Sequence, residues 1–279
     1  VAENAGGVHC LKYGLTVQNI ESIKIMTIDG DELVFSRNDD GLGLLALMTG
    51  SEGLLGIITE ITVKLTKKPE VAKLVMAGFD SVRDCADSVA GIIRHGIIPA
   101  GLEMMDEFAI QASEEFAKPG YPLGSKALLL CELDGSEESV IPDVDTVVSL
   151  LSKASSIRVS KSEEERLLLW KGRKAAFPAV GRISPDYYCM DGTIPKRHLA
   201  DVLEKINALS KHYSLRVANV FHAGDGNLHP LILYDAGVPG ELEKTEEFGN
   251  EILKLCIEVG GSITGEHGVG VEKLDAMCF

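Results

Sequence analysis

The sequence predicts a mixed fold, of the α+β or the α/β class, in which helices cover a sheet. Two patterns and the composition support this prediction. Residues 1–68 are rich in β-type patterns and glycine-containing loops, whereas from residue 71 onward strand-like apolar runs alternate with helical periodicity. Of the 279 residues, 45% are hydrophobic and 25% are charged, so the chain can bury a sizeable core.

Two β elements are expected in the first segment. Residues 22–36 alternate apolar and polar side chains around Asp29 and Gly30, a pattern typical of a β-hairpin. Residues 55–65 alternate well and are dominated by β-branched side chains, which predicts another strand. The stretch KKPE at 67–70 then breaks the pattern, and we place a domain boundary near 68–70.

The rest of the chain predicts strands that alternate with helices. Val82, Cys85 and Val89 keep helical spacing, and Gly96 ends that helix. A capping box from Ser162 to Glu165 opens another helix. The predicted strands are 71–79, 101–106, 126–135, 156–162, 216–223 and 228–234, and the predicted helices are 81–96, 107–117, 136–154, 162–173, 196–212 and 240–259.

Charge and cysteine content exclude several classes. The net charge of −15 argues against a nucleic-acid partner, because that binding is carried by clustered Lys and Arg. The six cysteines contain no C-x-x-C pair, so an iron–sulfur cluster held by this chain alone is not expected, and reduced cysteines suggest a cytoplasmic protein. No apolar run has membrane-spanning length and no signal peptide is visible. The missing initiator Met suggests a fragment of a longer protein.

The stretch VFHAGDGNLHP at 220–230 places two histidines around a turn. If Asp225 and Gly226 form the tip, His222 pairs directly with His229, and their Cβ atoms lie ~5 Å apart. Two imidazoles at that distance can share one metal ion, with Glu266 of the glycine-framed stretch GEHG as a third ligand. Such a set suits zinc, manganese or iron(II), although a lone hairpin histidine is more often structural.

Other stretches carry weaker signals. Arg173 follows Trp170 by three residues on one helix face and could grip a carboxylate, but the spacing alone favours an ordinary surface arginine. The glycine-rich stretches 4–7 and 50–56 could cradle a pyrophosphate. No G-x-G-x-x-G follows a strand, so a Rossmann site is not supported. His9, His95, His198 and His212 are interpreted as structural or surface residues.

Five long motifs together resemble the FAD-linked oxidase family, and within it the flavin subunits of bacterial glycolate oxidases. They are VAENAGGVHCLKYGLT, TGSEGLLGIITEITVKL, WKGRKAAFPAVGRISPDYYCMDGTIP, VFHAGDGNLHPLILYD and GEHGVGVEK. The resemblance implies an α+β fold, with 1–68 as the C-terminal part of an FAD-binding domain and 69–279 as a cap domain. The cap would carry an antiparallel sheet flanked by helices, together with the substrate and metal groups. The first FAD subdomain and the extreme C-terminus would be missing.

The resemblance also implies roles for individual residues. His222, His229 and Glu266 match the family's divalent-metal ligands, His267 its active-site histidine, and Arg173 the arginine that binds the substrate carboxylate. The positions that match flavin-contacting loops are Asn4, Ala5, Gly6, Gly7, Gly14, Gly56, Ile57 and Ile58.

The expected function is FAD-dependent oxidation of a 2-hydroxy acid to the 2-oxo acid. His267 would act as general base, and electrons would pass to an iron–sulfur partner subunit. Relatives that oxidise 2-hydroxyglutarate carry Thr and Lys where Phe177 and Cys189 stand here, so a small monocarboxylate such as glycolate or D-lactate is expected. The alternatives are a metal-dependent hydrolase or a non-catalytic subunit of an oxidase complex. The predicted location is cytoplasmic, or peripheral to the inner membrane through partner subunits.

Overall fold

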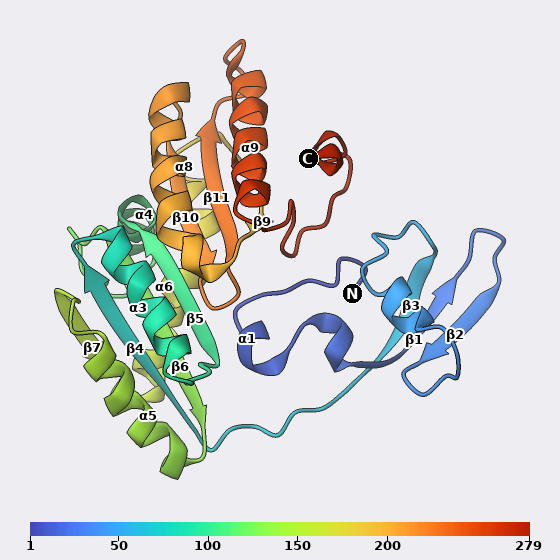
Figure 1. The fold of residues 1–279 in the computed structure, drawn as a ribbon, viewed down its shortest axis with the longest axis horizontal. Coiled ribbons are helices and arrows are strands. Elements are labelled where there is room, and N and C mark those ends of the chain that lie inside the picture. The colour runs from blue at the N-terminus through green and yellow to red at the C-terminus, as the bar shows by residue number, and fades with distance from the viewer.

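A small three-stranded sheet and a larger helix-covered sheet make up the computed structural model, which describes residues 1–279 (Figure 1). The small sheet has the order β2-β1-β3 and is antiparallel throughout. Its strands are β1 Ile20–Met26, β2 Glu32–Ser36 and β3 Ile57–Val63, and short helices accompany them at α1 Cys10–Tyr13, η1 Thr16–Asn19 and α2 Leu44–Met48. The two predicted strand regions are confirmed, whereas the short helices were not predicted.

The β1–β2 hairpin has the turn that its sequence predicts. Met26 pairs with Glu32, so the connection spans residues 27–31. The N–H of Gly30 donates to the carbonyl of Thr27 at 3.1 Å, and Gly30 has a φ of +85°. A turn followed by a left-handed residue suits glycine, which has no Cβ to clash. The pair Asp29-Gly30 therefore lies in the turn as expected.

The large sheet is antiparallel at every pairing and has the order β7-β4-β6-β5-β10-β11-β8, with β9 paired to β11. This decides between the two classes that the sequence left open, because an α/β fold would need parallel strands. Its strands are β4 Val71–Phe79, β5 Gly101–Asp106, β6 Ala127–Gly135, β7 Ser156–Val159, β8 Asp186–Cys189, β9 Gly192–Thr193, β10 Val217–His222 and β11 Asn227–Tyr234. The short strands β8 and β9 were not predicted.

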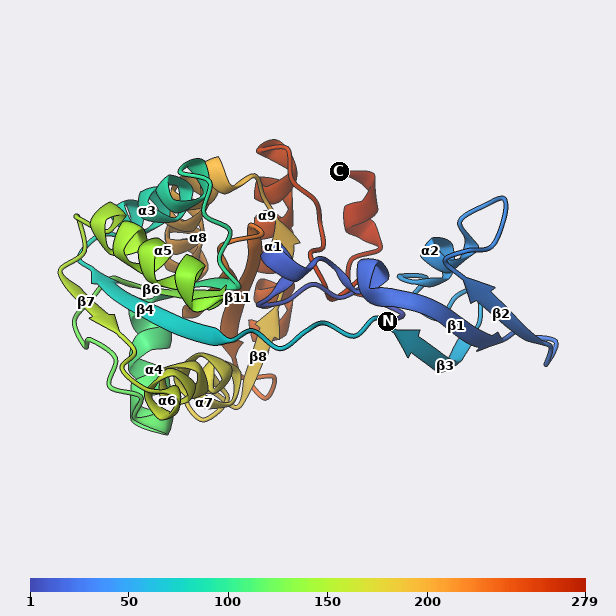
Figure 2. The same cartoon turned by 90° about the horizontal axis from the view of Figure 1, so that it is seen from below.

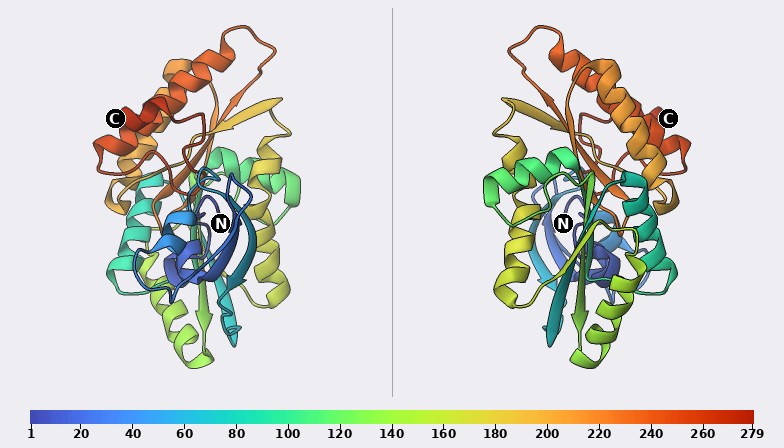
Figure 3. Two further views of the ribbon diagram at one scale, coloured as in Figure 1. Left: turned by 90° about the vertical axis from the view of Figure 1, so that its right-hand side faces the viewer. Right: turned by 90° about the vertical axis from the view of Figure 1, so that its left-hand side faces the viewer.

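Helices cover both faces of this sheet (Figures 2 and 3). One layer contains α3 Val82–Arg94, α5 Glu137–Leu150, α8 Leu199–Tyr213 and α9 Glu241–Glu258, and the other contains α4 Glu107–Ala117, α6 Glu163–Lys174 and α7 Ala176–Val180. Alternate residues of β6 enter the two cores: Leu129 faces the first and Leu128 the second. A strand buried on both faces reads as a continuous apolar run, which explains the sequence ALLLC.

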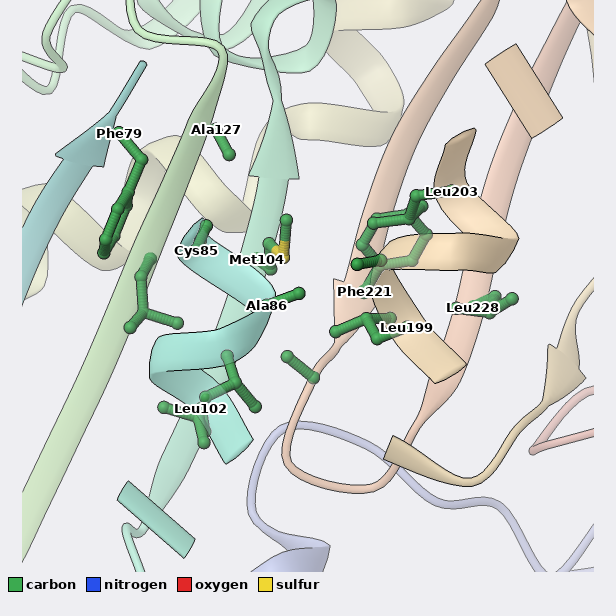
Figure 4. Packing of buried hydrophobic residues seen from close by; sticks show 14 of the residues in the cluster. Phe79, Cys85, Ala86, Leu102, Met104, Ala127, Leu199, Leu203, Phe221 and Leu228 are labelled. Carbon is green, nitrogen blue, oxygen red and sulfur yellow. The ribbon is translucent and has the colours of Figure 1, made fainter. Parts of the chain in front are cut away.

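The first core is the larger, with 32 buried residues against 18 in the second. Figure 4 shows Phe79 and Met104 of the sheet beside Cys85 of α3, and Phe221 of β10 beside Leu199 and Leu203 of α8. β5 and β10 themselves pair directly, with Met104 opposite Phe221 and Met105 opposite Val220. No helix in the structure combines the length and the apolar character that crossing a membrane requires.

Two local predictions need correction. The helix predicted from residue 196 begins as a 3₁₀ turn, η2 Lys196–His198, and a further 3₁₀ turn, η3 Asp275–Cys278, ends the chain. The Ser162 hydroxyl accepts the N–H of Glu165, but the Glu165 carboxylate accepts the N–H of Lys161, so the capping box is only half formed. In addition, the segment before Glu266 meets the sheet only at a single bridge, Thr193 to Ser262.

Asp106 connects β5 to α4 and provides a pH-dependent contribution to stability. Its carboxylate accepts the N–H of Ala109 at 2.9 Å and the backbone and side-chain N–H groups of Asn219 at 2.9 and 2.8 Å. Burial raises the pKa of Asp106 to about 6 in spite of these donors. A raised pKa means that the folded state holds the proton more tightly than the unfolded chain, so this contribution is lost as the pH rises.

We expect the free energy of unfolding to fall by about 3 kcal/mol at most between pH 4 and pH 6 on account of Asp106. Urea unfolding across this range would measure it, with Asp106→Asn as the variant that cannot titrate at this position. The difference in unfolding free energy between the two proteins should change with pH in this window. A constant difference would contradict the prediction.

Candidate active site

The β10–β11 hairpin holds both histidines, but not in the predicted register. His222 pairs with Asn227, and His229 pairs with Val220. The connection is the four residues 223–226 rather than a two-residue tip, and His222 and His229 are therefore diagonal neighbours on one face of the sheet. Diagonal neighbours remain within reach of long side chains. Their ring centroids lie 4.9 Å apart at an interplanar angle of 86°.

Glu266 completes a group of three with these histidines. Its Oε1 atom lies 3.1 Å from Nε2 of His222 and 2.9 Å from Nε2 of His229. Both histidines are buried, and neither ring nitrogen of His229 has a partner with hydrogen-bond geometry. Buried polar atoms without a partner are rare in folded proteins. Two converging imidazoles, a carboxylate and an unsatisfied nitrogen fit a divalent cation, and zinc, manganese and iron(II) all accept this donor set.

A second group of possible ligands, Asp191, His229 and His267, fits a metal less well. The rings of His229 and His267 are stacked, with centroids 5.1 Å apart and planes within 7° of parallel. Lone pairs of parallel rings lie in separate planes and do not converge on one ion. Asp191 is moreover paired with the ammonium group of Lys273. The structure therefore favours the group formed by His222, His229 and Glu266.

Arg173 and Glu103 form the buried floor of the site. Arg173 lies on α6, and its Nη2 atom is 2.6 Å from Oε2 of Glu103 on β5. The same carboxylate meets His222, with Oε1 2.7 Å from Nδ1. Nε and Nη2 of Arg173 have no partner with hydrogen-bond geometry, so this buried guanidinium retains unsatisfied donors. Unsatisfied donors on an arginine fit a carboxylate ligand, which accepts two N–H groups at once.

The two metal-candidate histidines have opposite pKa shifts. Burial lowers the pKa of His222, but the carboxylates of Glu103 and Glu266 outweigh burial and raise it to about 9. Burial dominates at His229 and lowers its pKa. Burial raises the pKa of Glu266, but the neighbouring imidazoles of His222 and His229 hold it well below its usual range. In this cluster a proton is therefore favoured on His222 and disfavoured on His229.

The loop that carries Glu266 and His267 is anchored by Asp191. Oδ2 of this buried carboxylate accepts the N–H groups of Gly265, Glu266 and His267 at 2.8, 2.7 and 3.1 Å. The charge of Lys273 outweighs the effect of burial and lowers the pKa of Asp191. Nδ1 of His267 lies 3.7 Å from Oδ1 of Asp191, and its side chain is 41% exposed. The loop thus presents His267 at the open side of the cluster.

Phe177 and Cys189 lie on the side of the sheet that carries the histidines. The ring of Phe177 contacts that of His229, with centroids 5.9 Å apart at 73°. Cys189 pairs with Leu231, two residues along β11 from His229, and therefore occupies the same face. Burial raises the pKa of the Cys189 thiol, so it stays neutral. The two positions that the sequence analysis singled out thus present an apolar ring and a neutral thiol.

The predicted flavin loop at residues 4–7 passes beside Glu266. A Cβ atom at Gly6 would lie 3.6 Å from Oε2 of Glu266, and one at Gly7 would lie 3.7 Å away. Asn4 has left-handed backbone geometry, with a φ of +48°. A cavity of about 380 Å³ is lined by Gly6, Gly7 and Gly265 among others. The structure therefore brings this loop to the candidate metal group.

The other predicted flavin residues are more dispersed. The Ala5 carbonyl accepts the hydroxyl of Thr16, and Gly14 follows α1 with a φ of +82°. Gly56, Ile57 and Ile58 lie at the start of β3 in the small sheet. Glu52 belongs to the glycine-rich stretch 50–56. Its carboxylate accepts the N–H groups of Val269 and Gly270, both at 2.7 Å. The glycine-rich stretch 50–56 is therefore tied to the loop that carries His267.

Three residues of the site were not found from the sequence: Glu103, Asp191 and Lys273. Glu103 did leave a signal, because a charged residue stands inside the short strand GLEMMD. Buried charges are rare unless they are paired. Asp191 and Lys273 have no local pattern that distinguishes them from surface residues.

Two buried histidines of the antiparallel sheet thus meet the carboxylate of Glu266 beside a buried arginine, a set of groups that could hold a cation and an anionic ligand. Residues 68–279 match the sequence model of the family described as FAD linked oxidases, C-terminal domain. The chain therefore belongs to this family.

Relatives with described functions match nearly the whole chain. The chain is 59% identical to the glycolate oxidase subunit GlcD of Escherichia coli K12, with 100% of the chain and 57% of that protein covered. It is 37% identical to the GlcD subunit of Bacillus subtilis, with 98% and 59% covered. It is 31% identical to a D-lactate dehydrogenase of Anaerostipes hadrus, with 99% and 61% covered. The chain thus spans less than two thirds of the length of these relatives.

Solved structures share the fold at low sequence identity. A 4-ethylphenol oxidase from Gulosibacter chungangensis superposes with a TM-score of 0.73 at 14% identity, over 96% of the chain and 61% of that protein. An alkyldihydroxyacetonephosphate synthase superposes with a TM-score of 0.71 at 17% identity, over 95% and 53%. These likenesses establish a shared fold.

Proposed function

We propose that the chain is part of an FAD-dependent enzyme that oxidises a small 2-hydroxy acid, glycolate or D-lactate, to the 2-oxo acid. The observation that carries this proposal is the convergence of His222, His229 and Glu266 beside Arg173 and His267. These groups suit a substrate with a carboxylate and a neighbouring hydroxyl. The relatives named glycolate oxidase subunit and D-lactate dehydrogenase act on substrates of this class by their names.

Residues 1–68 are proposed as the C-terminal part of an FAD-binding domain, and 69–279 as the cap domain. Two observations support this division. The backbone at Gly6 and Gly7 approaches Glu266 closely, so a flavin held by that loop would lie near the substrate. The small sheet leaves large apolar side chains exposed, among them Val34, Ile57 and Ile61, as expected for part of a larger domain.

Each residue of the candidate site has its own role in the proposed reaction. Arg173 binds the substrate carboxylate and so orients the α-carbon. His267 accepts the hydroxyl proton as general base, and Asp191 near its Nδ1 atom helps to orient the ring. A divalent ion held by His222, His229 and Glu266 would lower the hydroxyl pKa as a Lewis acid. Bound FAD would supply the hydride acceptor.

The apolar ring of Phe177 and the neutral thiol of Cys189 bear on whether the substrate has one carboxylate or two. A second carboxylate on the substrate would have to be desolvated against an apolar ring and a neutral thiol. Burying an unpaired charge is strongly unfavourable. This supports a monocarboxylic substrate over 2-hydroxyglutarate.

Electrons from the reduced flavin are proposed to pass to an iron–sulfur partner subunit. The Escherichia coli and Bacillus subtilis relatives are both named as subunits, which supports an assembly. The six cysteines of this chain are all free and contain no C-x-x-C pair, so a cluster would be carried by another chain.

Anaerobic flavin reduction tests the proposed function. In the longer protein that we propose contains this chain, glycolate or D-lactate should bleach the visible flavin band rapidly, whereas D-2-hydroxyglutarate should act at least ~100-fold more slowly. Bleaching by D-2-hydroxyglutarate at the same rate would contradict the substrate assignment. Absence of bleaching by all three acids would contradict the proposed reaction and favour a metal-dependent hydrolase or a non-catalytic subunit.

A further inference from the structure

Glu103 connects the two binding functions of the proposed site. It lies on β5, its side chain is fully buried, and its carboxylate contacts both His222 and Arg173. Oε1 lies 2.7 Å from Nδ1 of His222 on β10, and Oε2 lies 2.6 Å from Nη2 of Arg173 on α6. Three elements that are distant in sequence therefore meet at one carboxylate.

The contact with His222 determines which ring nitrogen faces the cluster. A carboxylate at Nδ1 favours a hydrogen on that atom, which leaves the lone pair on Nε2. Nε2 is the atom that lies 3.1 Å from Glu266. Glu103 therefore orients the imidazole for ligation and also increases its basicity.

The contact with Arg173 places a cation at the same carboxylate. A guanidinium with little exposure to water requires a charged partner, and Glu103 is the carboxylate that lies within 4 Å of it. Because Glu103 is held on both sides, its two partners are positioned relative to each other.

We propose that Glu103 is a positioning residue that Arg173 and His222 share, so that its loss weakens substrate-carboxylate binding and metal binding together. This inference rests on the proposed function, because it assigns a metal to His222 and a carboxylate to Arg173. Glu103 itself need not contact either ligand.

Glu132 offers a closely matched control. It lies on the adjacent strand β6 opposite Gly101, and like Glu103 it is a buried carboxylate paired with an arginine of α6. Its partners are Arg166 and Trp170. No histidine nitrogen lies within 4.0 Å of its carboxylate, so Glu132→Gln removes the same charge beneath the same helix without changing a proposed metal ligand.

The test is a titration of Zn²⁺ and of Mn²⁺ into the metal-free 279-residue chain. Glu103→Gln should weaken metal binding by ~10–100-fold, the usual effect of losing a partner of a ligating histidine, whereas Glu132→Gln should stay within about threefold of the unsubstituted chain. Glycolate binding to the Mn²⁺-loaded chain, followed by water-proton relaxation, should also weaken in Glu103→Gln. Arg173→Gln should weaken glycolate binding without weakening metal binding.

Each outcome separates this inference from the proposed function. Unchanged metal affinity in Glu103→Gln, beside tight binding by the unsubstituted chain, would overturn the inference alone. Absence of metal binding by the unsubstituted chain would overturn the proposed metal site, and this inference with it. If Glu103→Gln does not fold, Glu103→Gln with Arg173→Gln removes both buried charges together. That double variant should still bind metal ~10-fold or more weakly, and normal affinity would overturn the inference.

Discussion

Replacing His267 with alanine should slow flavin reduction by glycolate by ~10²–10⁴-fold in the longer protein, because the proposed general base is lost. FAD should stay bound, since the glycine loop at residues 4–7 does not depend on this imidazole. Rapid mixing under anaerobic conditions, monitored at the visible flavin band, measures the rate. The ring of His267 is stacked on His229 and partly exposed, so its removal leaves the buried cluster in place.

His95→Ala provides the control for this experiment. His95 is an exposed residue at the end of α3, far along the chain from the loop that carries His267. Flavin reduction in this variant should match that of the unsubstituted protein. A near-normal rate in His267→Ala would remove the role of His267 as base and would leave proton transfer to solvent or to another group.

Replacing His222 and His229 together should abolish metal retention. The double alanine variant keeps one of the three proposed ligands, and a single carboxylate holds a transition metal weakly. Metal analysis of the dialysed 279-residue chain measures the loss, and near-ultraviolet circular dichroism shows whether the fold persists. We expect stoichiometric metal in the unsubstituted chain and none in the variant.

A variant with the same number of histidines removed separates specific from adventitious binding. His95 and His212 are both exposed, so their double replacement by alanine should leave bound metal unchanged. Equal metal content in the unsubstituted chain and in both double variants would rule out His222 and His229 as the ligands. Asp191 and His267 would then be the candidate ligands.

Much of the fold follows from local patterns. The apolar run of β6 and the spacing of Val82, Cys85 and Val89 on α3 predict elements that the structure contains. These patterns can be recognised in a short stretch of sequence because the buried side chains of a strand or a helix recur at a fixed period. The short strands β8 and β9 lack such a period, because DYYC and GT are too short to show one.

Part of the site is also encoded locally. The stretches HAGDGNLH and GEHG contain the histidines and the carboxylate that come together, and the helix after Ser162 carries Arg173. The register of the hairpin was not predictable, because a two-residue and a four-residue turn both fit the same glycines. The tertiary structure selects the longer turn, whose Gly224 N–H donates to the carbonyl of Leu102 on β5.

Local sequence patterns were enough to order most strands and helices, to recognise the family and to identify the histidines and the arginine of the candidate site. The buried carboxylates that support those residues became visible only in the folded chain. Glu103 meets a histidine 119 positions away, and Asp191 meets Lys273 across 82. A buried charge requires a partner, but nothing in the local sequence specifies which one, because that choice is made by the packing of distant elements.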